Sequence, residues 1–135
     1  MKSKNLYKKE NVLDTKEMTA MAGYEATKDF IKACKKMPTA FFVGTDTIAT
    51  GVLKALYENN IKVPEDVSII GFNDLIASQY TVPPLSTVRV HIEHLAGASV
   101  DLILEKINKN RSYCKKVIIP SELVIRESTM KPKSN

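Results

Sequence analysis

The sequence predicts an α/β fold of the three-layer, doubly wound type, built on a parallel sheet. Two observations predict it: amphipathic helical stretches alternate with continuous apolar runs, and short polar turns join them. Apolar runs that do not alternate with polar residues are typical of strands covered on both faces. In such sheets ligands bind beyond the carboxyl ends of the strands, so the residues after each run are the candidates for a site.

The first helix is expected between Asp14 and Pro38. We expect Asp14 to cap it, with Glu17 three residues further on, as in a capping box. Pro38 ends the helix, because proline cannot donate a backbone hydrogen bond. Apolar side chains recur along one helical face, and these are Met18, Ala22, Ala26, Phe30 and Cys34.

Two strands and a second helix follow. The runs AFFVG, residues 40–44, and DVSIIGF, residues 66–72, are each expected to form a strand buried on both faces. Between them an apolar stripe predicts a helix that ends at Asn59 and Asn60. The stripe consists of Ile48, Ala49, Val52, Leu53 and Leu56.

Asp46 stands at the carboxyl end of the first strand and at the start of the second helix. Its carboxylate can cap that helix, which contributes about 1 kcal/mol, or it can accept hydrogen bonds from the hydroxyls of a polar ligand. The local sequence favours the cap. Asn73 and Asp74 follow the second strand, where a role in a turn is the simplest interpretation.

Composition places the chain among single soluble domains. It has 135 residues, of which 44% are hydrophobic and 26% charged. No apolar run approaches the roughly 20 residues that span a bilayer, and the first residues lack the apolar core of a signal peptide, so a cytoplasmic location is predicted. Cys34 and Cys114 fit no CxxC pattern, so we expect reduced thiols.

The net charge of +5 does not by itself indicate nucleic-acid binding. The lysines occur as scattered pairs, with no basic helix or basic–aromatic patch, so solvated lysines are the favoured interpretation over direct DNA contact by this chain.

No catalytic, cofactor or metal motif stands out. GTDTIATG, residues 44–51, is neither a P-loop nor a dinucleotide fingerprint, and the serines lack a His/Asp pattern. His91 and His94 are three residues apart, but beyond Glu93 no nearby residues complete a set of ligands for a metal ion. We therefore expect no enzyme activity, no cofactor and no metal.

Five motifs between residues 38 and 129 resemble, in the same order, the C-terminal part of the effector-binding domain of LacI/GalR repressors. They are PTAFFVGTD, VPEDVSIIGFND, PPLSTVRV, LAGASVDLIL and LVIREST. The resemblance implies part of a two-lobed, periplasmic-binding-protein-like fold of type I, which holds a small-molecule effector between its lobes. A sugar is the first expectation, with a galactoside as the guess and a purine as the alternative. Operator DNA would be bound through a helix-turn-helix headpiece that this chain lacks.

The resemblance also implies where the effector binds. Asp46 matches the family's cleft aspartate, although Thr45 stands where the family usually has asparagine. Glu17 and Met18 match a cleft-lining segment, and Val90 and Ile92 match positions where the chain crosses between lobes.

The family is commonly dimeric through the C-terminal lobe, so the resemblance also implies a dimer surface. Met21, Ala49 and Leu53 are its candidates, and ordinary core packing explains these three residues equally well.

On this basis residues 1–90 and 117–129 are expected to form an incomplete C-terminal lobe. Residues 91–116 would be a helix and crossover of the first lobe, and residues 130–135 a disordered tail. The apolar segment VDLIL, residues 100–104, would then lack cover, so we expect the chain to self-associate.

Two alternatives to the repressor interpretation remain. A solute-binding protein of sugar transport would share the fold but should carry an export signal. A truncated remnant would act only by oligomerisation with a longer copy.

Overall fold

The computed structural model describes residues 9–132, so the predicted tail is described only as far as Pro132. The elements in chain order are η2 (Lys9–Asn11), α1 (Ala20–Ala33), β1 (Ala40–Phe42), α2 (Asp46–Glu58), β2 (Ser68–Asn73), η3 (Ile76–Gln79), β3 (Ser86–Arg89), α3 (Ile92–Asn108) and β4 (Glu122–Val124). None of the helices in this part of the chain has the length and apolarity needed to cross a bilayer.

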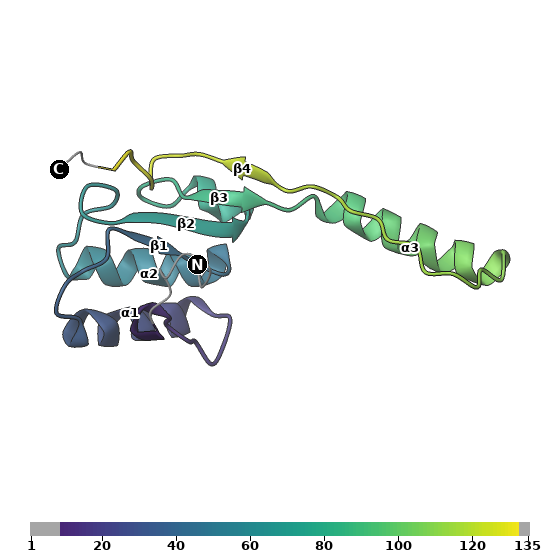
Figure 1. Ribbon diagram of the computed structural model, residues 1–135. Helices are drawn as coiled ribbons and strands as arrows, with labels where there is room; N and C mark the ends of the chain where they lie inside the picture. Colours follow the sequence, from purple (N-terminus) through teal and green to yellow (C-terminus); the bar gives the residue numbers. More distant parts are fainter. Residues whose placement is uncertain (1–8, 133–135) are drawn as a thin grey trace.

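The four strands form one sheet in the order β1-β2-β3-β4 (Figure 1). β1 pairs with β2 and β2 with β3 in parallel, which confirms the predicted α/β class. β4 pairs antiparallel with β3 because the chain returns to the sheet from a distant segment. The carboxyl ends of β1, β2 and β3 therefore share one edge of the sheet, as expected for a ligand site.

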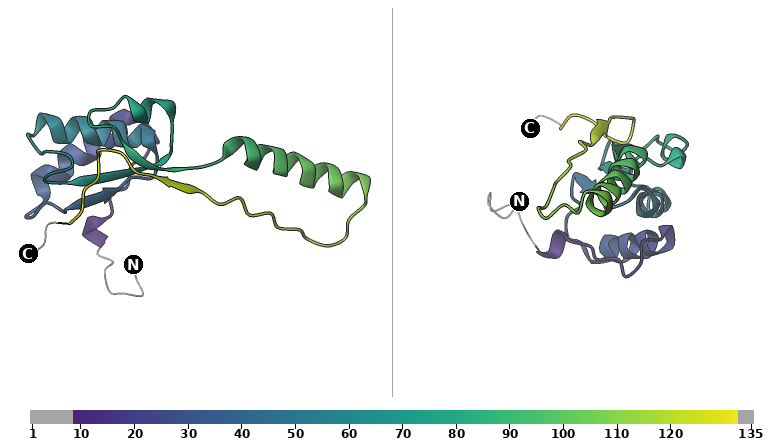
Figure 2. Two further views of the ribbon diagram at one scale, coloured as in Figure 1. Left: turned by 90° about the horizontal axis from the view of Figure 1, so that it is seen from above. Right: turned by 90° about the vertical axis from the view of Figure 1, so that its right-hand side faces the viewer.

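The helices α1 and α2 lie on the same face of the sheet (Figures 1 and 2). The predicted stripe of α2 is buried there against residues of the sheet such as Val67 and Ile69, and this forms the core. The described residues place no α-helix on the opposite face, so the expected third layer is not formed by this part of the chain.

The uncovered face corrects the prediction for AFFVG. Phe41 turns towards the helices and meets Phe30 of α1 edge-to-face at 5.7 Å between ring centroids. Phe42 points to the other face and is 68% exposed. The strand is thus covered on one face only, because no helix packs over the second.

The helix caps also differ from the prediction. α1 begins at Ala20, where the Thr19 hydroxyl accepts a hydrogen bond from the Ala22 nitrogen at 3.1 Å, so Asp14 lies outside the helix. At α2 the Thr45 hydroxyl caps the Ile48 nitrogen at 3.2 Å. Asp46 is the first residue inside the helix, so its predicted capping role is wrong. Each threonine stands directly before its helix, where its hydroxyl can accept from the backbone N–H three residues further on.

α3 leaves the sheet and projects as an arm, and the chain returns from its far end towards β4 (Figures 1 and 2). None of the α3 residues is buried, although Val100, Ile103 and Leu104 are apolar. The expectation that VDLIL lacks cover is therefore met in this structure.

Candidate functional site

A concave pocket lies at the neck between the sheet and the arm. Its volume is about 370 Å³, and it opens beyond the carboxyl ends of β2 and β3. Among the residues predicted for the site, Val90 and Ile92 line it. The full lining is Asn73, Asp74, Leu75, Ile76, Arg89, Val90, His91, Ile92, Glu93 and His94.

One wall of this pocket is a turn in left-handed backbone. Asn73 has a φ of 105° and Asp74 a φ of 56°. Asparagine and aspartate tolerate positive φ better than other side chains with a Cβ, but such a conformation still stores strain that its surroundings must hold. The Asp74 nitrogen donates to the Thr87 hydroxyl at 3.4 Å, which ties the turn to β3.

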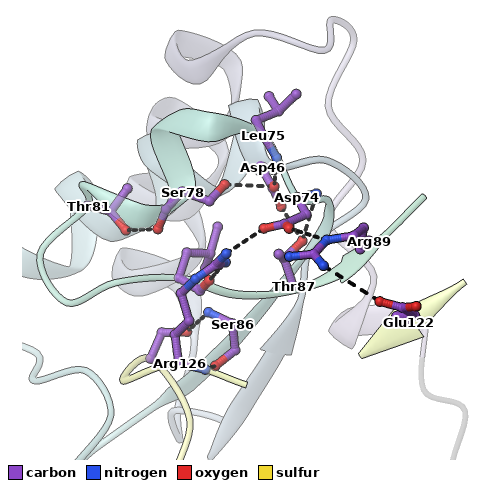
Figure 3. A network of polar contacts seen from close by, with 12 residues as sticks. Asp46, Asp74, Leu75, Ser78, Thr81, Ser86, Thr87, Arg89, Glu122 and Arg126 are labelled. Carbon is purple, nitrogen blue, oxygen red and sulfur yellow. Dashed lines mark hydrogen bonds and ion pairs between the residues drawn. The ribbon is translucent and has the colours of Figure 1, made fainter. Parts of the chain in front are cut away.

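Two arginines hold the Asp74 carboxylate from opposite sides (Figure 3). Arg89 of β3 donates through Nε at 2.7 Å, and Arg126, which follows β4, donates through Nη2 at 2.7 Å. Burial of Asp74 alone would raise its pKa. The hydrogen bonds from Arg126 and Arg89 outweigh that effect, and the pKa of Asp74 lies below its ordinary value of 3.8.

Asp46 lies behind this wall, with a residue exposure of only 2%. Its Oδ2 accepts from the Leu75 nitrogen at 2.8 Å and the Ser78 hydroxyl at 2.7 Å, and its Oδ1 accepts from the Thr87 hydroxyl at 2.6 Å (Figure 3). Both oxygens are therefore engaged within the chain. Asp46 does not line the pocket but fixes the segment around Leu75 that does.

The space around Asp46 is closed by Gly71 of β2. A Cβ at Gly71 would overlap Asp46 Oδ1 and would stand 3.0 Å from the Leu85 side chain. The buried carboxylate thus needs glycine beside it, and the hydroxyl of Thr87 links it to the Asp74 turn.

The neck itself is bridged by Glu122 of β4. Its carboxylate lies 3.6 Å from Arg89 Nη1 and 3.2 Å from His91 Nε2, so it joins the outgoing and the returning chain. His91 and His94 are 5.9 Å apart between ring centroids. Within residues 9–132 no group of three or more suitable side chains could hold a metal ion.

The remaining predicted residues lie elsewhere. Glu17 and Met18 are exposed in the segment before α1 and do not line this pocket. Met21 is exposed and lines a second hollow between α1 and α2. Ala49 and Leu53 are buried in the chain's own core, so they offer no surface to a partner, and core packing is their correct explanation.

Sequence reasoning missed Arg89 and Arg126 as parts of the site. Both belong to motifs that carried the family resemblance, PPLSTVRV and LVIREST. Their ion pairs with Asp74 span 15 and 52 residues of chain, and no local pattern reports contacts of that range.

Comparison with known proteins gives a consistent picture. Residues 1–129 match the family of periplasmic binding protein-like domains. The chain is 36% identical over 115 residues to the transcriptional regulator GalR of Streptococcus thermophilus, covering 85% of this chain and 35% of that protein. It is 34% identical over 113 residues to a lactose operon repressor of Rhizobium radiobacter, covering 84% of this chain and 98% of that sequence.

Solved structures agree with these relatives. The lac repressor dimer bound to operator and the anti-inducer ONPF matches with a TM-score of 0.76 and 29% identity, over 84% of this chain and 39% of that one. A LacI family regulator from Enterococcus faecium with bound ribose matches with a TM-score of 0.77 and 28% identity, over 90% of this chain and 44% of that one. The chain thus spans about a third of the Streptococcus relative and less than half of either solved chain.

Proposed function

Because the chain belongs to the periplasmic-binding-protein-like family and to its LacI/GalR group of transcriptional repressors, we propose that it senses a small polar effector at the neck pocket. The observation that carries the proposal is the position of this pocket beyond the carboxyl ends of two parallel strands, where ligands of α/β sheets bind. A sugar suits it best, and the ribose bound to the Enterococcus relative supports that class.

The lining suits an uncharged polyol. The amide of Asn73 can donate and accept hydrogen bonds, and His91 and His94 each offer ring nitrogens. The one carboxylate in the turn, that of Asp74, is already paired with two arginines, so it adds little unbalanced charge. Val90 and Ile92 supply apolar contacts for the face of a sugar ring.

Asp46 keeps a place in this proposal as the residue that holds the pocket wall. A direct contact with the effector would require its bonds to Leu75, Ser78 or Thr87 to open. Glu17 and Met18 stay proposed as cleft residues on a wall that the described pocket does not include.

The proposed action is a shift of population. An effector that binds one arrangement of the lobes more tightly than another changes the share of the DNA-competent state, and no chemical reaction is needed. The same proposal places the protein in the cytoplasm and makes it a dimer that uses Met21. It also includes contact of residues 91–116 with a first lobe and binding of operator DNA through a headpiece. Neither the transport nor the remnant alternative is favoured, because the relatives named above are transcriptional regulators.

The test is a titration of the chain with galactose, a methyl galactoside, ribose and a purine, followed by amide chemical shifts in NMR spectra. We expect a sugar to shift residues of the neck pocket. Asn73→Gly removes the amide side chain without straining the backbone at φ 105°, and we expect about fivefold weaker binding, as for one lost hydrogen bond.

Asn60→Gly is the matched control, because Asn60 also has positive φ, 57°, but follows α2 and lines neither hollow. It should leave the sugar response unchanged. Absence of any response in the wild-type chain, or an equal response in Asn73→Gly, would contradict the proposed effector site.

A further inference from the structure

A cluster of basic residues lies at the far end of the arm. Residues 105–116, which we call the arm tip, contain five of the chain's 20 basic residues and one acidic residue, a local net charge of +4. The basic residues are Lys106, Lys109, Arg111, Lys115 and Lys116. In the structure this tip lies at the end of the arm away from the sheet and the neck pocket (Figures 1 and 2).

Interactions within the chain neutralise only some of the basic residues of the arm tip. One or two cations suffice to balance the negative end of α3. Glu105, the acidic residue of the tip, pairs with Lys115 at 2.8 Å and lies 4.0 Å from Arg111. Among residues 9–132 no ion pair engages Lys106, Lys109 or Lys116, so three cations remain for a partner.

Arg111 gives an independent sign of an absent partner. Its side chain is only 7% exposed, and its Nε is buried without a hydrogen-bond acceptor in the described part of the chain. The guanidinium donates through Nη1 to the Tyr113 carbonyl and its carbon lies 5.2 Å from the Tyr113 ring, which holds it in place. A buried donor without an acceptor is costly, so a movement of the Arg111 side chain that brings Nε to an anionic oxygen outside the tip would remove this cost.

The sequence alone favoured solvated lysines over direct DNA contact, but the grouping of basic residues at one end of the arm (Figure 1) changes that expectation. We propose that the arm tip contacts the phosphate backbone of duplex DNA, independently of base sequence. Duplex DNA carries one charge per about 1.7 Å of axis, so flexible lysines need no precise geometry to engage it. An acidic protein would require an apolar centre in its interface, whereas the arm tip has only Ile107 and Tyr113 as large apolar or aromatic side chains. The choice of DNA rests on the proposed function as part of a DNA-bound regulator.

This contact would add affinity but no base specificity, because phosphate contacts position a protein without identifying the sequence. The tip and the neck pocket lie at opposite ends of α3, so the two ligands do not compete for residues.

The test measures binding of the whole 135-residue chain to a fluorescein-labelled duplex of mixed sequence, by anisotropy at a series of salt concentrations. We expect the affinity to fall steeply as salt rises. The triple variant Lys106→Gln, Lys109→Gln, Lys116→Gln should lower the slope of log K against log salt by about 2.7, which is 0.9 for each lost phosphate contact.

The matched control is Lys32→Gln, Lys35→Gln, Lys36→Gln, which removes the same charge from exposed lysines in and after α1. It should keep the wild-type slope, and circular dichroism melts should show all three proteins folded alike. Three results would each overturn the proposal. They are an equal fall of the salt slope in both triple variants, no binding of DNA by the wild-type chain at low salt, and displacement of the DNA by polyglutamate as effectively as by unlabelled DNA. The sugar titration is read from the neck pocket, so either inference can fail while the other stands.

Discussion

Two aspartates at the edge of the sheet, Asp46 buried and Asp74 half-buried, are stabilised in different ways. Asp46 is held by neutral donors from backbone and hydroxyl groups, whereas Asp74 is held by two guanidinium groups. The Thr87 hydroxyl donates to Asp46 and accepts from the backbone of Asp74, so the two carboxylates support one wall. The geometry of the pocket therefore depends also on Asp46 and Thr87, which do not line it.

The Asp74 ion pairs predict a pH-dependent contribution to stability. The pKa of Asp74 is lower in the folded chain than its ordinary value of 3.8, so the folded state favours the ionised form. The contribution is fully present above the unfolded pKa and is lost as pH falls through the lower folded pKa. We expect Asp74→Asn to reduce the free energy of unfolding by about 1–3 kcal/mol at pH 7, measured by urea denaturation.

At acid pH the two proteins should converge, because Asp74 becomes protonated and neutral in the wild type as well. Asp29→Asn is the control, since Asp29 makes an exposed pair with Lys32 at 3.6 Å, and such pairs contribute about 0–1 kcal/mol. A difference between wild type and Asp74→Asn that persists unchanged through the acid range would show that the ion pairs are not its cause.

For individual residues, the sequence predicts where a side chain lies relative to the strands better than it predicts which groups that side chain contacts. Asp46, Asn73 and Asp74 were placed correctly at strand ends, because apolar runs locate strands and the chain must turn after them. The donors to Asp46 lie 29 to 41 residues away, so their identity depends on how the strands pair. The capping prediction failed because Thr45, one residue earlier, competes for the same backbone donor.

At the scale of elements, α1 and α2 approach closely through glycines. A Cβ at Gly51 of α2 would overlap the carbonyl oxygen of Ala20 and come within 2.7 Å of the Tyr24 nitrogen, both in α1. A Cβ at Gly23 would likewise overlap the backbone of Ile48. The two helices thus touch backbone to backbone, and their separation depends on the absence of side chains at these two positions.

Gly51→Ala therefore tests the packing of the helix pair. We expect it to reduce the free energy of unfolding by at least about 1–3 kcal/mol, because backbone atoms cannot move aside without separating the helices. Gly97→Ala in α3 is the opposite case, since nothing lies within 4 Å of its new Cβ. It should leave stability unchanged or raise it by about 0.5–1 kcal/mol, as alanine favours helix. Equal urea midpoints for the two variants would contradict the close approach.

Elements were predictable where a single periodicity decides them. The stripe of α2 and the termination at Asn59 and Asn60 follow from local spacing and are confirmed. The exposure of Phe42 and the antiparallel direction of β4 depend on which segments the chain brings over the sheet. An apolar run predicts a strand, but it does not show whether the same chain also contains the elements that pack on both faces of that strand.

For the whole molecule, apolar side chains remain exposed in several places, and two of these belong to regular elements that lack a packing partner. One is the sheet face that carries Phe42, and the other is α3, which contains no buried residue. Ile92, Val100, Ile103 and Ile107 recur along α3 at intervals close to whole turns, so they form one stripe. In proteins most of the stability of a helix comes from tertiary packing of its apolar face, so we expect contact with another surface to stabilise the arm.

We therefore predict that the isolated chain self-associates through these surfaces. Light scattering should give a mass that rises above the monomer as concentration increases. Ile103→Lys in α3 and Phe42→Lys in β1 should each weaken association about tenfold or more, because burying one such side chain contributes about 1.5–3 kcal/mol.

Tyr57→Lys on α2 is the control: Tyr57 is 82% exposed but belongs to neither surface, so its replacement should leave the mass unchanged. A monomer at every concentration, with a single two-state melt, would mean that the arm is stable without cover. If all three lysine variants weakened association equally, the added positive charge would be the cause, and the apolar stripe of α3 would not be the surface of association.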